Sequence, residues 1–136
     1  MGAKEGGKRE FVVELDSMIE FASKGIVSKT FLDTPDANVG IFCMEKGQSL
    51  SEHTSRMPAT IQILRGRAKI RLGEEDNEYG PGAWIYIPDR LNHALMALED
   101  FVFLLTLFPR GKKLGRRIPS DLTVFYIFSD DIKQPG

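Results

Sequence analysis

The chain has 136 residues, of which 42% are hydrophobic and 27% charged, and this composition is typical of one globular domain rather than a disordered or collagen-like chain. Its formal net charge of -1, from 18 basic and 19 acidic residues, gives no overall field that would attract nucleic acid or anionic lipid. The single cysteine, Cys43, cannot close an intramolecular disulfide and is too few for a thiolate zinc site.

The chain shows no sign of a membrane or secretory segment. No apolar stretch approaches the roughly 20 residues that span a bilayer. The first eight residues lack the apolar run of a secretory signal. We therefore expect a cytoplasmic protein with neither a membrane nor a nucleic acid as partner.

Short apolar segments separated by glycine and proline predict a chain built mainly of strands. One short helix is expected at 16–24, with Asp16 or Ser17 as its cap and Gly25 as its stop. Successive short strands between turns favour an antiparallel barrel or sandwich. The predicted strands are 11–15, 26–32, 39–44, 51–55, 59–64, 68–72, 83–87, 93–97, 101–108 and 122–128.

Two charged segments and the last strand complete the predicted elements. The acidic run 74–78 is expected to be a hairpin loop, and the basic run 110–117 an exposed loop. The strand 122–128 is too apolar to remain in water, so it must pack on the barrel or on a second subunit. Core positions are expected at Val39, Ile41, Ile61, Ile63, Ile70, Leu72, Ile85, Ile87, Leu95, Val102, Leu104 and Leu107.

The chain has two histidines, His53 and His93, and each follows a glycine at a suggestive distance. The first segment runs from Gly47 through His53 to Gly66, and the second from Gly82 through Pro88 to His93. These segments resemble the two signature motifs of the cupin superfamily, G(X)5HXH(X)3-4E(X)6G and G(X)5PXG(X)2H(X)3N. The resemblance covers about residues 25–108. The chain is similar to the small single-domain bacterial cupins in particular. It implies an all-β, antiparallel jelly-roll barrel, with both histidines directed to one inward-facing spot.

Residues 1–136 are therefore expected to form one cupin-type domain. Its motif-bearing core spans about 25–108, and 109–136 adds a basic loop and a terminal strand. The resemblance and the apolar last strand together predict a homodimer.

The sequence departs from the motifs where cupins hold a metal. The resemblance implies a site in which three histidines and a glutamate hold Fe, Mn, Ni, Cu or Zn. In this chain Ser55 replaces the second histidine of the motif and Ala59 replaces the glutamate. Two imidazoles supply half of these protein ligands and no negative charge. Two other motif positions also differ, with Arg90 in place of a glycine and Ala97 in place of the asparagine.

Other residues near the motifs are candidates to line the site. Ser51 and Ser55 share the face of His53 if that strand is regular, so both are candidate hydrogen-bonding groups. Ser55 is the stronger candidate because it occupies a ligand position of the motif. Trp84 and Tyr86 share one face of their strand, and pattern alone does not decide whether that face points inward, where Tyr86 would contact a ligand, or outward.

Two functions of different classes remain. In the first, the barrel binds a small organic molecule at His53, Ser55, His93 and Tyr86, without assigned catalytic residues. In the second, His53 and His93 hold a divalent transition metal in an enzyme of the dioxygenase or isomerase kind. An accessory protein that uses the basic loop and last strand as its contact surface is a third possibility.

Overall fold

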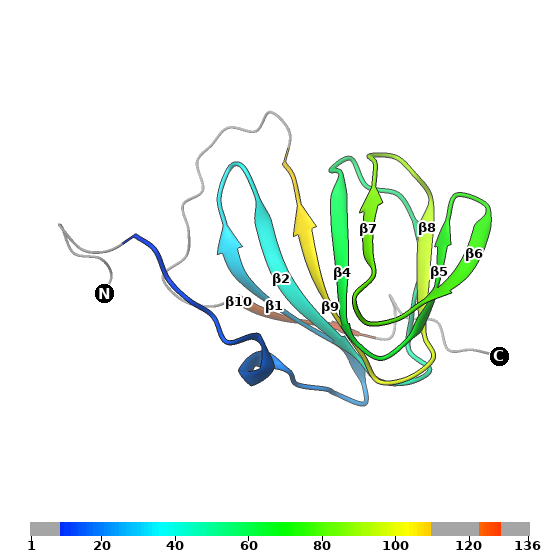
Figure 1. The fold of residues 1–136 in the computed structure, drawn as a ribbon, viewed down its shortest axis with the longest axis horizontal. Helices are drawn as coiled ribbons and strands as arrows, with labels where there is room; N and C mark the ends of the chain where they lie inside the picture. Colours follow the sequence, from blue (N-terminus) through cyan, green and yellow to red (C-terminus); the bar gives the residue numbers. More distant parts are fainter. Residues whose placement is uncertain (1–8, 110–122, 129–136) are drawn as a thin grey trace.

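The computed structural model describes residues 9–109 and 123–128, which form two antiparallel sheets packed face to face (Figure 1). A six-stranded sheet has the order β10-β1-β2-β9-β4-β7, and a four-stranded sheet has the order β3-β8-β5-β6. This arrangement confirms the predicted all-β jelly-roll barrel. The strands are β1 (Gly25–Asp33), β2 (Asn38–Met44), β3 (Ser49–His53), β4 (Ala59–Arg65), β5 (Ala68–Leu72), β6 (Glu75–Tyr79), β7 (Trp84–Ile87), β8 (His93–Ala97), β9 (Phe101–Leu107) and β10 (Thr123–Phe128).

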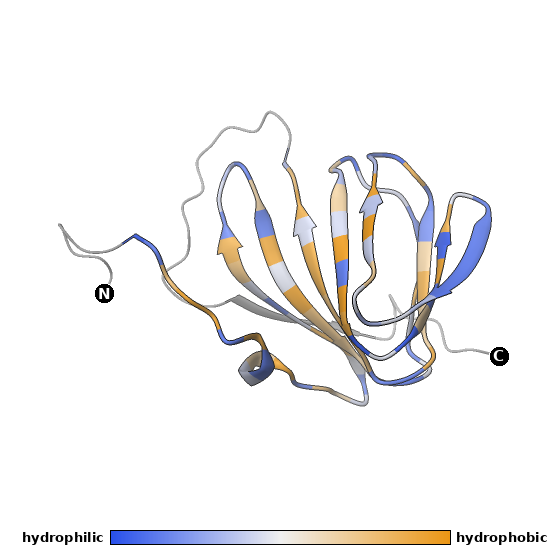
Figure 2. Cartoon of the chain, in the orientation of Figure 1, coloured by the Kyte–Doolittle hydropathy of each residue, from blue (hydrophilic) through white to orange (hydrophobic). Residues whose placement is uncertain are grey.

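The main core lies between the two sheets because each contributes the apolar half of an alternating pattern (Figure 2). Ile61 and Phe103 come from the six-stranded sheet, and Ile70 and Leu95 from the four-stranded sheet. The motif glycine Gly66 has a φ of 79° in the turn after β4, where a side chain would collide with the carbonyl of Asp100. The turn therefore needs glycine for both its conformation and its close approach.

A second core covers the outer face of the six-stranded sheet. Its fully buried members include Ile41 and Val102, so these two predicted core residues lie outside the barrel interior. Two other predicted core positions, Val39 and Leu104, are only partly buried. The remaining eight belong to the main core or pack against it.

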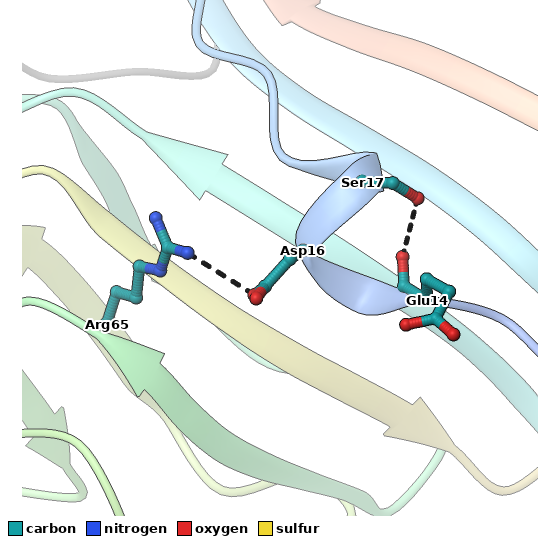
Figure 3. A network of polar contacts seen from close by, with 4 residues as sticks. All are labelled: Glu14, Asp16, Ser17 and Arg65. Carbon is teal, nitrogen blue, oxygen red and sulfur yellow. Dashed lines mark hydrogen bonds and ion pairs between the residues drawn. The ribbon is translucent and has the colours of Figure 1, made fainter.

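The second core is covered by an N-terminal strap, which we define as residues 11–22. The predicted helix at 16–24 is wrong: its only helical part is a four-residue 3-10 turn, η1 (Leu15–Met18). The predicted strand at 11–15 is also wrong, because 11–14 has no strand partner among the described residues. An extended chain covers more of a sheet per residue than a helix does, about 3.3 Å against 1.5 Å. The Asp16 carboxylate pairs with Arg65 of β4 at 3.3 Å, and Ser17 donates its hydroxyl hydrogen to Glu14, within the strap (Figure 3).

The four-stranded sheet corrects the prediction for the acidic run 74–78. It is mostly strand β6, which pairs with β5 across a two-residue turn that begins at Gly73, with a φ of 68°. The pairing sets Arg71 opposite Asp76 with a shortest contact of 2.8 Å, and cross-strand charge pairs of this kind stabilise a sheet. The acidic residues of β6 therefore lie opposite the basic residues of β5.

The predicted last strand is confirmed as β10, which pairs with β1 of the same chain. The basic loop 110–117 lies outside the described residues. Within the part of the chain that the structure describes, no helix has the length and apolar character needed to cross a membrane.

Candidate functional site

His53 and His93 meet at one end of the four-stranded sheet. They are direct partners in the pairing of β3 with β8, so both side chains leave the same face of the sheet. Their ring centroids are 4.2 Å apart and the ring planes are inclined by 61°. His93 shares this face with Leu95, a member of the core, so the pair lies on the barrel's inner side. The convergence predicted from the motifs is confirmed.

A bulge in β3 makes this meeting possible. Leu50 is opposite Leu95 and His53 is opposite His93, so β3 uses one more residue than β8 between the two pairs. Ser51 consequently does not share the face of His53, as a regular strand would require, but lines a groove on the sheet's outer side. The predicted shared face required a regular strand, and the bulge removes that condition, so the two side chains do not share a face.

Both imidazoles are fixed in the same way. Nδ1 of His53 lies 2.8 Å from the carbonyl oxygen of Ser51, and Nδ1 of His93 lies 2.8 Å from that of Leu91. Because a carbonyl oxygen only accepts, each Nδ1 must carry the hydrogen. The neutral form of each ring therefore has its lone pair on Nε2. Within the described residues, no hydrogen bond engages either Nε2.

The two rings differ in exposure. His53 is exposed, whereas His93 is half-buried. Burial lowers the pKa of His93 below its ordinary value of 6.5, the bond to Leu91 opposes this change, and the nearby His53 lowers the pKa further. His93 is accordingly neutral at pH 7, and Nε2 of this ring is a hydrogen-bond acceptor.

Ser55 lies in the loop after β3 and joins this loop to the one that precedes β8. Its hydroxyl oxygen accepts the Met57 amide at 3.0 Å, and its carbonyl accepts the Arg90 amide at 2.7 Å. Arg90 itself has a φ of 67°, a left-handed conformation that favours glycine. At the position of the motif glycine, arginine thus adopts a backbone conformation that glycine adopts more easily.

Tyr86 lies apart from the histidines, and this placement corrects its assignment to the interior. Ile85 and Ile87 face the core, so the alternating residues Trp84 and Tyr86 face outward and are 62% and 52% exposed. The aromatic pattern alone could not reveal this, because an alternating aromatic–isoleucine strand is apolar on both faces.

Sequence reasoning missed a groove on the outer face of the four-stranded sheet. It has a volume of about 390 Å³ and is open to solvent, and Lys69, Arg71 and Met96 are among its lining residues. The sequence of β5, Ala-Lys-Ile-Arg-Leu, alternates apolar and basic residues, and this alternation indicates that the two basic residues lie on the outer face. It also missed the two carbonyls that orient the histidines, which any residue type supplies.

The residues present do not form the metal site that the resemblance implies. No group of three or more His, Cys, Asp or Glu side chains capable of holding a metal occurs among the described residues. Ala59, at the position of the motif glutamate, is buried in the main core opposite Ile87 and Leu107. The pair thus offers two imidazole nitrogens without a carboxylate.

No protein-family model and no curated protein matches the chain. Solved structures do match. A conserved protein of unknown function from Streptococcus pyogenes is 27% identical, with a TM-score of 0.68 over 82% of this chain and 98% of its own. A cupin superfamily protein from Desulfitobacterium hafniense is 22% identical, with a TM-score of 0.66 over 74% and 93% of the two chains. An uncharacterised protein with a double-stranded β-helix domain from Klebsiella pneumoniae is 15% identical, with a TM-score of 0.68 over 89% and 100%.

Proposed function

We propose that this chain, which has the double-stranded β-helix fold of small cupin barrels, binds a small organic molecule at His53 and His93. The observation that carries the proposal is the shared geometry of the two rings. They are 4.2 Å apart and each has its Nδ1 hydrogen held by a backbone carbonyl. Two preoriented polar groups beside an apolar core are typical of small-molecule sites.

The protonation of the pair indicates the chemistry of the ligand. Nε2 of the neutral His93 ring is an acceptor, so the matching group on a ligand is a donor such as hydroxyl or amide N–H. A second positive charge so close to the first is unfavourable, which keeps at least one ring neutral. The site therefore favours uncharged donors over carboxylates at neutral pH.

Apolar residues near the pair favour a ligand with an apolar body. Leu72 is the cross-strand partner of His93, and Leu91 supplies the carbonyl that orients this ring. Both leucines pack against the main core. Ser55, whose hydroxyl can still donate, is the third polar group that we assign to the site.

The proposal is tested by NMR of the histidine rings in the presence of simple probes. Phenol and benzyl alcohol each carry a donor hydrogen on an apolar body, and their methyl ethers lack only that hydrogen. We expect the alcohols to shift the Nε2 resonances of both rings and the ethers to leave them unchanged. Equal responses to alcohols and ethers, or no response to any probe, would contradict the proposal.

Variants at His93 separate binding from folding. His93→Ala should abolish the response of the His53 ring to phenol while the ligand-free protein keeps most of its stability in urea. A large loss of stability without ligand would instead make His93 a structural residue. Val12→Ala, at an 87% exposed position of the N-terminal strap, is the control.

A metal-dependent enzyme of the dioxygenase or isomerase kind is the second candidate, and the fixed tautomer favours it. Histidines that bind metals commonly donate their other ring hydrogen to a carbonyl, as both do here. Ligand atoms from substrate or water would have to complete the coordination. Elemental analysis of protein purified without chelator tests this candidate: less than about a tenth of an equivalent of Fe, Mn, Ni, Cu or Zn would remove it.

A further inference from the structure

The four edges of the two sheets are protected to different degrees. Edge strands with unpaired backbone groups usually carry charges, prolines or bulges that prevent pairing with another chain. In the four-stranded sheet, β6 carries Glu75, Asp76 and Glu78, and β3 contains the bulge before His53. In the six-stranded sheet, neither β10 (Thr-Val-Phe-Tyr-Ile-Phe) nor β7 (Trp-Ile-Tyr-Ile) has these devices, and both pair with their neighbours in regular register. β7 also exposes two aromatic side chains, Trp84 and Tyr86.

The backbone of β7 also presents unpaired groups at this edge. The Ile63 amide donates to the Ala83 carbonyl at 3.0 Å, so Ala83 directs its carbonyl toward β4. Because antiparallel strands alternate their bonding direction, Ile85 and Ile87 also direct their backbone groups toward β4. The N–H and C=O groups of Trp84 and Tyr86 consequently point away from the sheet, where no described strand meets them.

From these features we propose that β7 pairs with β7 of a second copy of this chain about a two-fold axis near Ile85. Such pairing sets Trp84 opposite Tyr86 of the partner subunit, and Tyr86 opposite the partner's Trp84. Each of these pairs exchanges two backbone hydrogen bonds.

The side-chain pattern of β7 is what favours a second copy over a different protein. Around Ile85 the strand reads the same in both directions, aromatic–isoleucine–aromatic, so an antiparallel copy brings like surfaces together. The outward rings of the two copies become neighbours on one face, and aromatic cross-strand pairs stabilise a sheet. Since β7 carries no charge, no like charges oppose one another, and the 62% exposed Trp84 becomes partly covered.

Trp84 is the only tryptophan of the chain, so its fluorescence reports on this edge alone. The full chain would be diluted from high to low micromolar concentration while light scattering gives the mass and the emission maximum of Trp84 is recorded. We expect the mass to double with concentration and the emission to shift to the blue over the same range. A monomer at every concentration overturns the proposal, and so does doubling without a change in emission, which would place the contact elsewhere, such as on β10.

A pair of variants at Tyr86 tests the backbone pairing. Tyr86→Pro removes the outward N–H, which edge strands tolerate because it makes no bond within the sheet. Tyr86→Val keeps that N–H and removes only the ring. We expect the proline variant to be monomeric and the valine variant to dimerise, with equal circular dichroism spectra. Dimerisation of a folded Tyr86→Pro variant would overturn the proposal, and the dilution experiment on the parent chain stands whether or not this variant folds.

Discussion

The two sheets of this barrel differ in how many of their faces are covered. The six-stranded sheet buries both faces in part, one against the main core and the other beneath the N-terminal strap. The four-stranded sheet buries only its inner face, and its outer face carries Lys69, Arg71 and the open groove. The histidine pair lies at the end of this one-sided sheet. The comparison indicates that a sheet covered on both faces is committed to apolar packing, whereas the singly covered sheet has room for polar groups on its outer face.

The largest expected effect comes from placing a carboxylate on the outer face of each sheet. Val102 is fully buried under the strap, so Val102→Asp leaves an unpaired charge in an apolar layer and should cost about 3–5 kcal/mol of the free energy of unfolding. Met96→Asp lies opposite Lys69 in the open groove and should cost about 1 kcal/mol or less. Urea denaturation of both variants measures the difference. Equal losses would show that the two outer faces are alike.

Much of this difference was accessible from the sequence. The motif glycines and histidines predicted the barrel and the meeting of His53 with His93, because paired strands bring distant residues together in a defined register. The alternating apolar and basic residues of Ala-Lys-Ile-Arg-Leu also predict that Lys69 and Arg71 lie on the outer face of the sheet. These features depend on local spacing, which one sequence records directly.

The parts that were missed depend on contacts between distant segments. Residues 16–24 have the local signals of a helix, yet they contain only part of a short 3-10 turn because the strap packs on Ile41 and Val102. The local sequence predicts a loop for the acidic run 74–78 because the residue that pairs with it, Arg71, lies on a neighbouring strand. The bulge that separates Ser51 from the face of His53 has no signature in local sequence. In each case tertiary packing overrides the local pattern.

A second prediction concerns the pH dependence of the one-sided sheet. The pKa of His93 is lowered by burial, so the native state binds fewer protons than the unfolded state, and stability should fall as the pH drops below 6.5. His93→Gln removes this group and should lose less stability than the parent chain between pH 7 and pH 5. Urea midpoints at the two values provide the comparison. The idea fails if the two proteins lose equal stability.

A third, smaller effect is expected in the loop beside the histidines. Arg90 is exposed and has a φ of 67°, which is unfavourable for a side chain but not for glycine. Arg90→Gly relieves this strain but makes the unfolded chain more flexible, so we expect a net gain of about 1 kcal/mol or less. Arg90→Ala keeps the strain and serves as the control. A glycine variant that is less stable than the alanine variant would show that the arginine side chain stabilises the loop.

The smallest effect should come from the ion pair that joins the strap to the six-stranded sheet (Figure 3). Asp16 and Arg65 are 3.3 Å apart, but their side chains are 87% and 56% exposed, so water and salt screen the attraction. Asp16→Asn should change the free energy of unfolding by less than about 0.5 kcal/mol. Met18→Ala, which removes a buried strap residue of the outer core, should cost about 2 kcal/mol or more. If urea denaturation gave the reverse order, charge rather than apolar contact would hold the strap, and the outer face of this sheet would not be a second core.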